Sequence, residues 1–169
     1  MTTSSPYPQS KSEPLRFEGR DEALSLVLLL AEQAKKQICI LSPDIDSALF
    51  DNSTFINTVS ELARKSAHTQ VRILVHSSLA AAQHDHRLIS LGQRLTSSIH
   101  IHNTAKQHRD LQQIMLLVDD FAYLLCPRAS QYNGSACLYD RLELRQLQST
   151  FDSYWQQSTP DITVRRLEL

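Results

Sequence analysis

The stretch QQIMLLVDDFAYLLCP, residues 112–127, decides the fold because two apolar runs flank a single acidic pair. Short apolar runs of this kind are typical of buried strands. Only Asp119 and Asp120 separate the two runs, and so short a connection suits a hairpin. We therefore predict adjacent antiparallel strands over residues 112–119 and 121–126.

Upstream of this hairpin, three stretches with apolar residues at helical spacing each precede a short apolar run typical of a buried strand. The helical stretches are residues 21–37, 53–67 and 86–95, and the runs are residues 37–42, 69–76 and 98–102. Lys35 and Lys36 would lie in the last turn of the first helix, and Ser53 or Thr54 would cap the second. An αβαβαβ order implies right-handed crossovers and therefore parallel strands.

One more helix and one more strand are predicted after the hairpin. Residues 141–157 have helical periodicity, with these side chains inward: Leu144, Leu147, Phe151 and either Tyr154 or Trp155. Residues 162–169 are expected to form the last strand. Together the elements predict an α/β fold, a mixed and mostly parallel sheet flanked by helices.

Length and composition suit one domain. The chain has 169 residues with 41% hydrophobic and 21% charged, which is ordinary globular usage. Residues 1–16 contain three prolines among serines and have little apolar surface to bury, so we expect a disordered tail. The single domain is then expected to cover residues 17–169.

Charge and hydropathy limit the partners. Seventeen Lys and Arg face eighteen Asp and Glu, so no overall basic field attracts nucleic acid or an anionic membrane. The N-terminus lacks the layout of a signal peptide, and the apolar runs are far shorter than the ~20 residues of a membrane span. We expect a cytoplasmic protein that does not bind membranes, with nucleic acid an unfavoured partner.

Neither a cofactor nor a metal ion is expected. The three cysteines are Cys39, Cys126 and Cys137. They are odd in number and lack metal-ligand spacing, which favours reduced core thiols. The His-x-His pairs are His84 with His86 and His100 with His102. Such a pair lies on one face of a strand, but neither an HExxH motif nor a cysteine pair supplies the further ligands that zinc needs.

Several local stretches resemble a phospholipase D-like domain. EALSLVLLLAEQAKKQ leading into QICILSPDID, and the later AHTQVRILVHSS, are similar to the first half of such a domain. QQIMLLVDDFAYLLC resembles the strand and turn of the superfamily's His-x-Lys-x-x-x-x-Asp segment, and FDSYWQQS resembles its closing helix. The similarity covers residues 20–157 and implies a phospholipase D-like fold, in an uncharacterised bacterial subgroup.

The resemblance fails where catalysis needs it. Aligning Asp119 with the motif's aspartate places Gln112 at the nucleophilic histidine and Ile114 at the phosphate-binding lysine. Cys126 and Pro127 stand where the superfamily has Gly-Ser. An amide cannot form a phosphohistidine intermediate, and isoleucine cannot neutralise a transferring phosphoryl group. The resemblance therefore implies a degenerate motif without catalysis.

The loop SPDIDSALFDN is a candidate ligand site. It follows a predicted parallel strand and places Asp44, Asp46 and Asp51 at the carboxyl edge of the sheet, where open α/β sheets bind ligands. His76, at the end of the next strand, is a further candidate. The alternative roles are Asx turns and helix capping for the aspartates, and an ordinary hydrogen bond for the histidine.

The start of the last helix, YDRLELR, is a second candidate. It presents Asp140, Arg141 and Arg145, and the two arginines share one helix face. Arginines there are suited to a phosphate or a carboxylate, or to pairing with the acidic loop, and the pattern favours this internal ion network.

Two function classes remain open. The first is a non-catalytic module that binds a partner protein or a phosphorylated ligand. The second is a divergent phosphodiesterase or nuclease whose nucleophile has moved to His76, His102 or His108. A histidine beside Arg141 in one pocket favours the enzyme, and scattered imidazoles favour the module. The resemblance also implies a homodimer, because active members join two motif-bearing halves and this chain has one.

Overall fold

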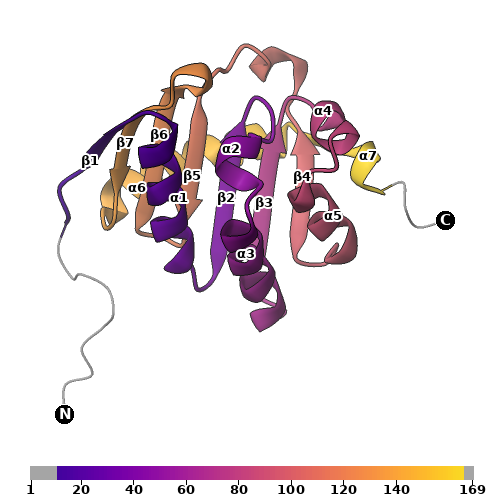
Figure 1. The fold of residues 1–169 in the computed structure, drawn as a ribbon, viewed down its shortest axis with the longest axis horizontal. Helices are drawn as coiled ribbons and strands as arrows, with labels where there is room; N and C mark the ends of the chain where they lie inside the picture. The colour runs from indigo at the N-terminus through magenta and orange to yellow at the C-terminus, as the bar shows by residue number, and fades with distance from the viewer. Residues whose placement is uncertain (1–10, 166–169) are drawn as a thin grey trace.

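The computed structural model describes residues 11–165, which form an α/β domain around one eight-stranded sheet (Figure 1). The strand order is β1-β7-β6-β5-β2-β3-β4-β8. The strands are β1 Leu15–Glu18, β2 Gln37–Ser42, β3 Gln70–Val75, β4 Ile99–Asn103, β5 Ile114–Val118, β6 Ala122–Arg128, β7 Asn133–Cys137 and β8 Thr159–Pro160. The helices are α1 Arg20–Glu32, α2 Ser47–Phe50, α3 Ser53–Lys65, α4 Leu79–Gln83, α5 Arg87–Arg94, α6 Arg141–Gln156 and α7 Ile162–Arg165.

The predicted mixed sheet flanked by helices is confirmed. Parallel pairing is confined to β2, β3 and β4, which follow the αβαβαβ order of the sequence. The other neighbours pair antiparallel, so the sheet contains more antiparallel pairs than expected. The excess comes from β1, β7 and β8, which the apolar patterns do not predict.

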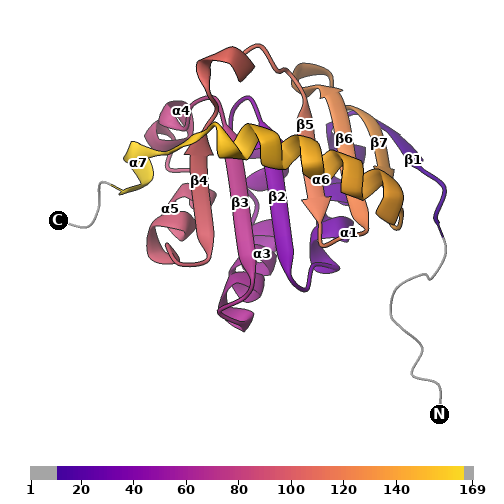
Figure 2. The same ribbon diagram turned by 180° about the vertical axis from the view of Figure 1, so that it is seen from behind.

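Helices lie on both faces of the sheet and enclose two cores. α1, α2, α3 and α5 cover the face in front in Figure 1, and α6 crosses the opposite face (Figure 2). The larger core, with Phe50 and Phe55, lies on the front face. The smaller core, with Leu117 and Phe151, lies under α6. Successive side chains of each central strand point alternately into the two cores. Both faces of these strands are therefore apolar.

The predicted hairpin is confirmed as β5 and β6. Ile114 pairs with Cys126 and Val118 pairs with Ala122, so the turn consists of residues 119–121. Asp119 in this turn has a φ of 51°, in the left-handed region. Aspartate tolerates that conformation better than most residues because its short polar side chain hydrogen-bonds locally.

Two helix ends differ from the prediction. α1 ends at Glu32, so Lys35 and Lys36 are not in its last turn and belong instead to the connection to β2. The N-cap of α3 is Asn52, whose side chain accepts a hydrogen bond from the Phe55 amide at 2.8 Å. Capping by Ser53 or Thr54 is therefore wrong by one or two residues, because asparagine caps a helix as well as serine does.

β1 overturns part of the predicted tail. It begins at Leu15 and pairs antiparallel with β7, and Phe17 is only 2% exposed. The tail prediction is therefore wrong at its C-terminal end, while residues 1–10 lie outside the described residues. β7 reads NGSAC, which has low strand propensity. A Cβ at Gly134 would lie 1.9 Å from the Leu125 carbonyl oxygen, so only glycine fits there.

The predicted last strand is wrong within the described residues. Ile162–Arg165 form α7, and residues 166–169 lie outside the described part. The strand at this edge is the two-residue β8, in which Pro160 pairs with His102. The β-branched run ITV favours a strand locally, but Pro160 has no N–H to continue a ladder, and tertiary context overrides the propensity.

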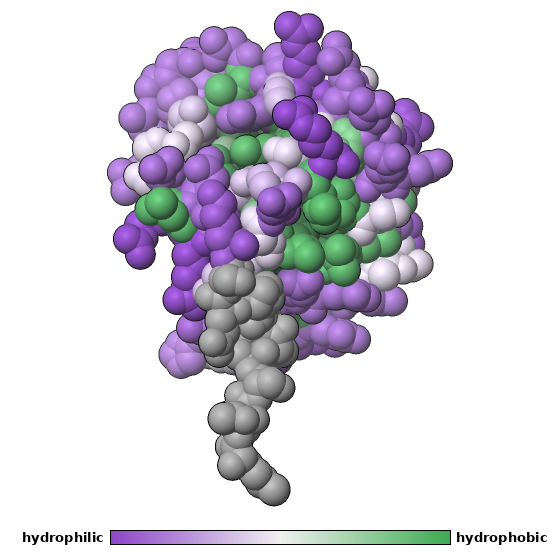
Figure 3. Space-filling view, turned by 90° about the vertical axis from the view of Figure 1, so that its left-hand side faces the viewer, coloured by the Kyte–Doolittle hydropathy of each residue, from purple (hydrophilic) through white to green (hydrophobic). Residues whose placement is uncertain are grey.

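The β1 edge carries exposed apolar side chains. Figure 3 views the molecule from this edge and shows a hydrophobic patch among polar groups. Leu15 of β1 and Leu29 of α1 are 43% and 40% exposed.

Within residues 11–165, none of the helices is long and apolar enough to span a membrane.

Candidate functional site

Asp119, the residue aligned with the aspartate of the resembled motif, hydrogen-bonds to the backbone of a distant segment of the chain. Its side chain accepts hydrogen bonds from the amides of Lys35, Lys36 and Gln37 at 2.9, 2.8 and 3.0 Å. The Asp119 amide donates in turn to the Gln37 carbonyl at 3.0 Å. These bonds tie the β5–β6 turn to the start of β2, which gives the carboxylate a structural role.

Gln112 and Ile114 lie at the other end of β5. Gln112 precedes the strand and is exposed. Ile114 is 0% exposed and belongs to the front core. Its neighbour across the hairpin, Cys126, is also buried, and Pro127 is exposed. The position that aligns with the phosphate-binding lysine is thus filled with apolar atoms.

His76 follows β3 at the carboxyl edge of the sheet, where both of its ring nitrogens are engaged. Nδ1 lies 2.7 Å from the Thr104 hydroxyl, and Nε2 lies 2.7 Å from the Leu111 carbonyl oxygen. Because a carbonyl only accepts, Nε2 carries the proton in this bond. The imidazole therefore fastens the segment between β4 and β5 to the end of β3.

The three aspartates of the acidic loop do not converge on one point. Asp44 is exposed. Asp46 caps α2 through the Leu49 amide at 3.0 Å and accepts a hydrogen bond from the Tyr132 hydroxyl at 2.7 Å. Asp51 accepts a hydrogen bond from Arg87 Nε at 2.8 Å. Two of the three thus serve capping and pairing.

His86, beside that pair, is the N-cap of α5. Its Nδ1 accepts a hydrogen bond from the Leu88 amide at 3.1 Å, and the residue is 3% exposed. Burial lowers the pKa of the imidazole below its ordinary value, against the opposing charge of Asp51. The neutral form is the one that caps, because a proton on Nδ1 would remove the acceptor.

This capping histidine predicts a pH dependence of stability. As the pH falls below about 6.5, the unfolded imidazole takes up a proton more readily than folded His86, whose pKa is lowered, so the free energy of unfolding falls. His86→Asn can cap without titrating and should show a smaller loss between pH 7.5 and 5.5 in urea denaturation. His84→Asn, at an exposed neighbouring position, is the control. Equal losses in the wild type and His86→Asn would contradict this role for His86.

The His-x-His pairs are placed differently from each other. His84 and His86 flank the turn between α4 and α5, so the expectation that they share a strand face is wrong. His100 and His102 do share a face of β4, but His102 stacks on Trp155 at 3.8 Å. Within residues 11–165, no three His, Cys, Asp or Glu side chains cluster to hold a metal ion.

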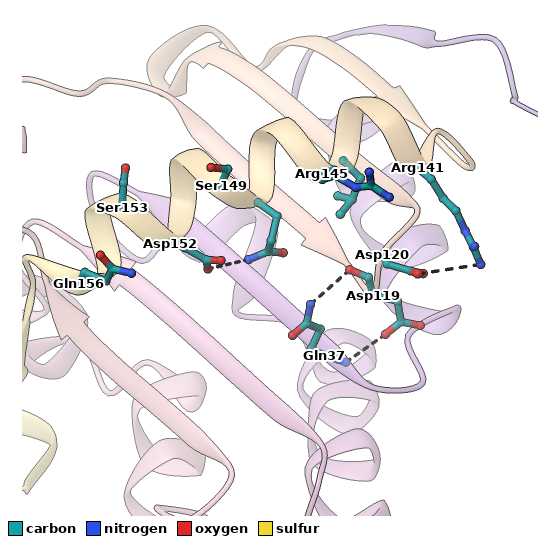
Figure 4. A pocket seen from close by; sticks show the side chains of 11 residues that line it. Gln37, Asp119, Asp120, Arg141, Arg145, Ser149, Asp152, Ser153 and Gln156 are labelled. Atoms are coloured by element: carbon teal, nitrogen blue, oxygen red, sulfur yellow. Dashed lines mark hydrogen bonds and ion pairs between the residues drawn. The ribbon is translucent and has the colours of Figure 1, made fainter.

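A cleft of about 730 Å³ opens beneath α6, where β2 begins and β5 ends (Figure 4). Arg141 and Arg145 line it from the helix, and Asp119 and Asp120 line it from the hairpin turn. Arg141 lies 3.9 Å from Asp120, and both side chains are largely exposed. No histidine of the described chain is among the lining residues.

Asp140 does not belong to this cleft. It caps α6 by accepting a hydrogen bond from the Glu143 amide at 3.1 Å, and Lys11 Nζ lies 3.4 Å from its other oxygen. It is 6% exposed, so its carboxylate serves the helix end.

The predicted candidates fall into separate groups. β5 runs antiparallel to β2 and carries the turn to the opposite edge of the sheet from Asp44 and His76.

Gln37, Gln148 and Asp152 also belong to the cleft, although sequence reasoning did not single them out. A signal for part of the set was present in the polar stripe of α6. Residues three and four apart share a helix face, and Arg141, Arg145, Gln148 and Asp152 follow that spacing. Gln37 carries no such signal, since only the fold brings β2 beneath α6.

Sequence comparison defines the family. A family model described as a domain of unknown function, DUF7931, matches residues 19–167. The chain belongs to the DUF7931 family. None of the curated proteins matches this DUF7931 chain by sequence.

Solved structures define the fold. The DUF7931 chain is similar to TrmBL2, an archaeal chromatin protein, with a TM-score of 0.63, 14% identity and 88% of this chain covered. It spans about half of that protein, 54% of its length. Nuc from Salmonella typhimurium, a phospholipase D family member, gives a TM-score of 0.61 at 14% identity, over 88% of this chain and 98% of Nuc.

Phosphatidylserine synthase from Haemophilus influenzae Rd KW20 gives a TM-score of 0.61 at 16% identity, over 93% of this chain and 41% of the synthase. Identities this low show the fold alone. The DUF7931 chain therefore has a phospholipase D-like fold, and its activity must be argued from its own residues.

Proposed function

We propose that this DUF7931 domain is a non-catalytic phospholipase D-like module that binds a partner protein or a phosphorylated ligand. The observation that carries the proposal is the burial of Ile114 at the position aligned with the phosphate-binding lysine, where it is 0% exposed in an apolar core. Gln112, at the position of the nucleophile, is an amide. Apolar packing thus occupies the position of the lysine. The domain therefore keeps the phospholipase D-like fold without the residues that the reaction needs.

The chemistry supports this proposal. The phospholipase D route requires an imidazole that attacks phosphorus and a cation that stabilises charge on the equatorial oxygens. An amide nitrogen has no lone pair available for attack, since that pair is delocalised into the carbonyl. A buried isoleucine offers no charge, and the loss of a preorganised donor or cation costs about 3 to 4 kcal/mol of transition-state stabilisation.

The placement of the histidines argues against a relocated nucleophile. His76 is held at both ring nitrogens, and His102 lies flat against Trp155 with Nδ1 2.8 Å from the Ser158 hydroxyl. His108 packs on Tyr154 with ring centroids 4.6 Å apart. None of the three lines the cleft that holds Arg141. Scattered imidazoles of this kind support the module.

We expect the purified protein not to hydrolyse phosphodiesters. The assay uses a chromogenic phosphodiester and single- and double-stranded nucleic acid, each with and without divalent metal. Nuc, a phospholipase D family member with the same fold, serves as a parallel comparison. His76→Ala, His102→Ala and His108→Ala are assayed beside the wild type. Turnover that one of these substitutions abolishes would overturn the proposal and establish the relocated-nucleophile enzyme.

Pairing with a second copy remains part of the proposal, on the ground that active members of the superfamily join two motif-bearing halves. Light scattering after gel filtration measures the mass in solution across a concentration series. A mass of 19.2 kDa at every concentration, the value for one chain, would contradict the homodimer without affecting the binding role.

A further inference from the structure

We propose that the cleft beneath α6 binds a small anion that also carries a hydroxyl group, as a polyol phosphate or a hydroxycarboxylate does. This inference rests on the proposed function, since it names a ligand class for a non-catalytic module. The cleft lies at the edge of the sheet where β5 ends, whereas Gln112 and Ile114 lie where β5 begins. It therefore shares Asp119 with the degenerate motif but not Gln112 or Ile114. A volume of about 730 Å³ is in the range of small-molecule sites.

The carboxylates of the cleft are largely engaged by the protein itself. Asp119 accepts three backbone hydrogen bonds, from the amides of residues 35–37. Asp152 forms an ion pair with Arg72 at 3.1 Å and accepts a hydrogen bond from Gln148 Nε2 at 3.0 Å. Arg72 thus balances the charge of Asp152, whereas the charge of Asp119 is stabilised by neutral amides and stays in place.

Two guanidinium groups of the cleft, those of Arg141 and Arg145, lie with the carboxylates of Asp119 and Asp120 in its lining. Arg141 is 3.9 Å from Asp120, a distance at which an exposed pair contributes little. Arg145, one turn along the same face of α6, has no carboxylate within ion-pair distance among residues 11–165. Figure 4 shows its side chain beside those of Asp120 and Arg141. A planar guanidinium without a carboxylate partner is suited to a phosphate or a carboxylate.

Gln148 adds an acceptor to the same cleft. Its Oε1 is buried and has no hydrogen-bond partner among residues 11–165. The amide orientation is fixed, because Nε2 donates to Asp152 and lies 3.7 Å from Cys39 Sγ. Turning the amide over would place Oε1 against the Asp152 carboxylate. A buried acceptor without a donor destabilises the protein. A ligand hydroxyl that donates a hydrogen bond to Oε1 would remove this cost.

The helix sets the distance between the two groups. Arg145 and Gln148 are three residues apart on α6, which places their Cβ atoms about 5 to 6 Å apart. Ser149 lines the cleft from the same helix and carries a hydroxyl, whereas the Ser153 hydroxyl donates to the Thr150 carbonyl at 2.7 Å. The ligand must therefore carry its hydroxyl close to its anionic group. Glycerol 3-phosphate and glycerate both satisfy this requirement.

The test measures binding by isothermal titration at pH 8 with four probes. Glycerol 3-phosphate is compared with propyl phosphate, and glycerate with propionate, so that each pair differs in its hydroxyl groups. Comparing the first pair with the second separates a phosphate from a carboxylate source. We expect a hydroxylated probe to bind more tightly than its hydroxyl-free counterpart. Arg145→Gln should weaken it by about tenfold or more, the loss typical of a charged hydrogen bond.

Two further variants make the result specific. Arg64→Gln removes an exposed arginine of α3 on the opposite face and should leave binding unchanged. Gln148→Leu should reduce the preference for the hydroxylated probe while propyl phosphate or propionate binds as before. If that variant does not fold, the comparison of Arg145→Gln with Arg64→Gln still decides, because both residues are exposed.

Two outcomes overturn the inference. The first is the absence of binding by any probe at 10 mM, on the order of the weakest affinity worth calling a site. The second is equal weakening in Arg145→Gln and Arg64→Gln, which would mean attraction to surface charge alone. Either result, without turnover, leaves a protein partner as the ligand of the module. Release of inorganic phosphate from glycerol 3-phosphate would instead overturn the proposed function.

Discussion

Ile114→Lys, the substitution that restores the motif's lysine, is expected to lower the free energy of unfolding by about 5 kcal/mol at pH 7. Ile114 is 0% exposed and belongs to the front core, so the ammonium would be enclosed by apolar side chains without water. A lysine in such a place stays folded mainly as the neutral amine. Removing its proton at pH 7 from a group whose usual pKa is about 10.4 accounts for most of this loss.

The pH dependence of this loss in stability shows whether the buried ammonium group causes it. A lysine whose pKa is depressed on folding destabilises the protein below its unfolded pKa, and this penalty shrinks as the pH rises toward 10. The deficit of Ile114→Lys relative to the wild type should therefore decrease by about 2 to 3 kcal/mol between pH 7 and pH 9. Urea denaturation at both pH values measures it.

Ile114→Met is the matched control, because it keeps the side chain apolar and of similar volume and should cost less than about 1.5 kcal/mol. A lysine variant as stable as this control at pH 7 would show that the motif position can reach solvent. The non-catalytic proposal would then lose the observation that carries it, and the variant should be assayed together with Gln112→His.

Asp119→Ala is expected to cost about 3 kcal/mol of stability. The substitution leaves the amides of Lys35, Lys36 and Gln37 without their acceptor. It also places alanine at a φ of 51°, where a Cβ without a local hydrogen bond is strained by roughly 1 kcal/mol or more. Chemical denaturation measures the loss, and hydrogen exchange should show faster exchange of those three amides.

Two control variants separate these causes. Asp119→Asn keeps one acceptor oxygen and tolerates the left-handed conformation, so its loss should be about 1 kcal/mol. Asp120→Ala changes the exposed neighbour in the same turn and should stay within about 0.5 kcal/mol of the wild type. If Asp119→Ala and Asp120→Ala have the same denaturation midpoint, the carboxylate does not hold the start of β2.

Most of the central fold could be predicted because it is encoded in local periodicity. The hairpin of β5 and β6, and the alternation of α1, β2, α3, β3, α5 and β4, appear in the apolar patterns. Among the elements that were not predicted, β1 and β7 are short and contain few apolar residues. Their pairing depends on β7 meeting β6 closely enough to require Gly134 at the contact with Leu125.

The proposed loss of the motif's histidine and lysine rests on residue type alone, since Gln112 and Ile114 occupy the aligned positions whatever the fold does. The role of Asp119 could not, because its partners Lys35, Lys36 and Gln37 are more than eighty residues away in the chain. The same holds for His76, which meets Leu111 only through the packing of the intervening segment.

The sequence by itself determined the central strands and helices, because these depend on residue type and on spacing within one element. Tertiary structure alone decided that Arg141 and Arg145 lie far from the acidic loop. β5 runs antiparallel to β2, so the turn that begins at Asp119 comes to the amino end of β2, whereas Asp44 follows its carboxyl end. Strand direction is set by long-range pairing, which no local pattern records.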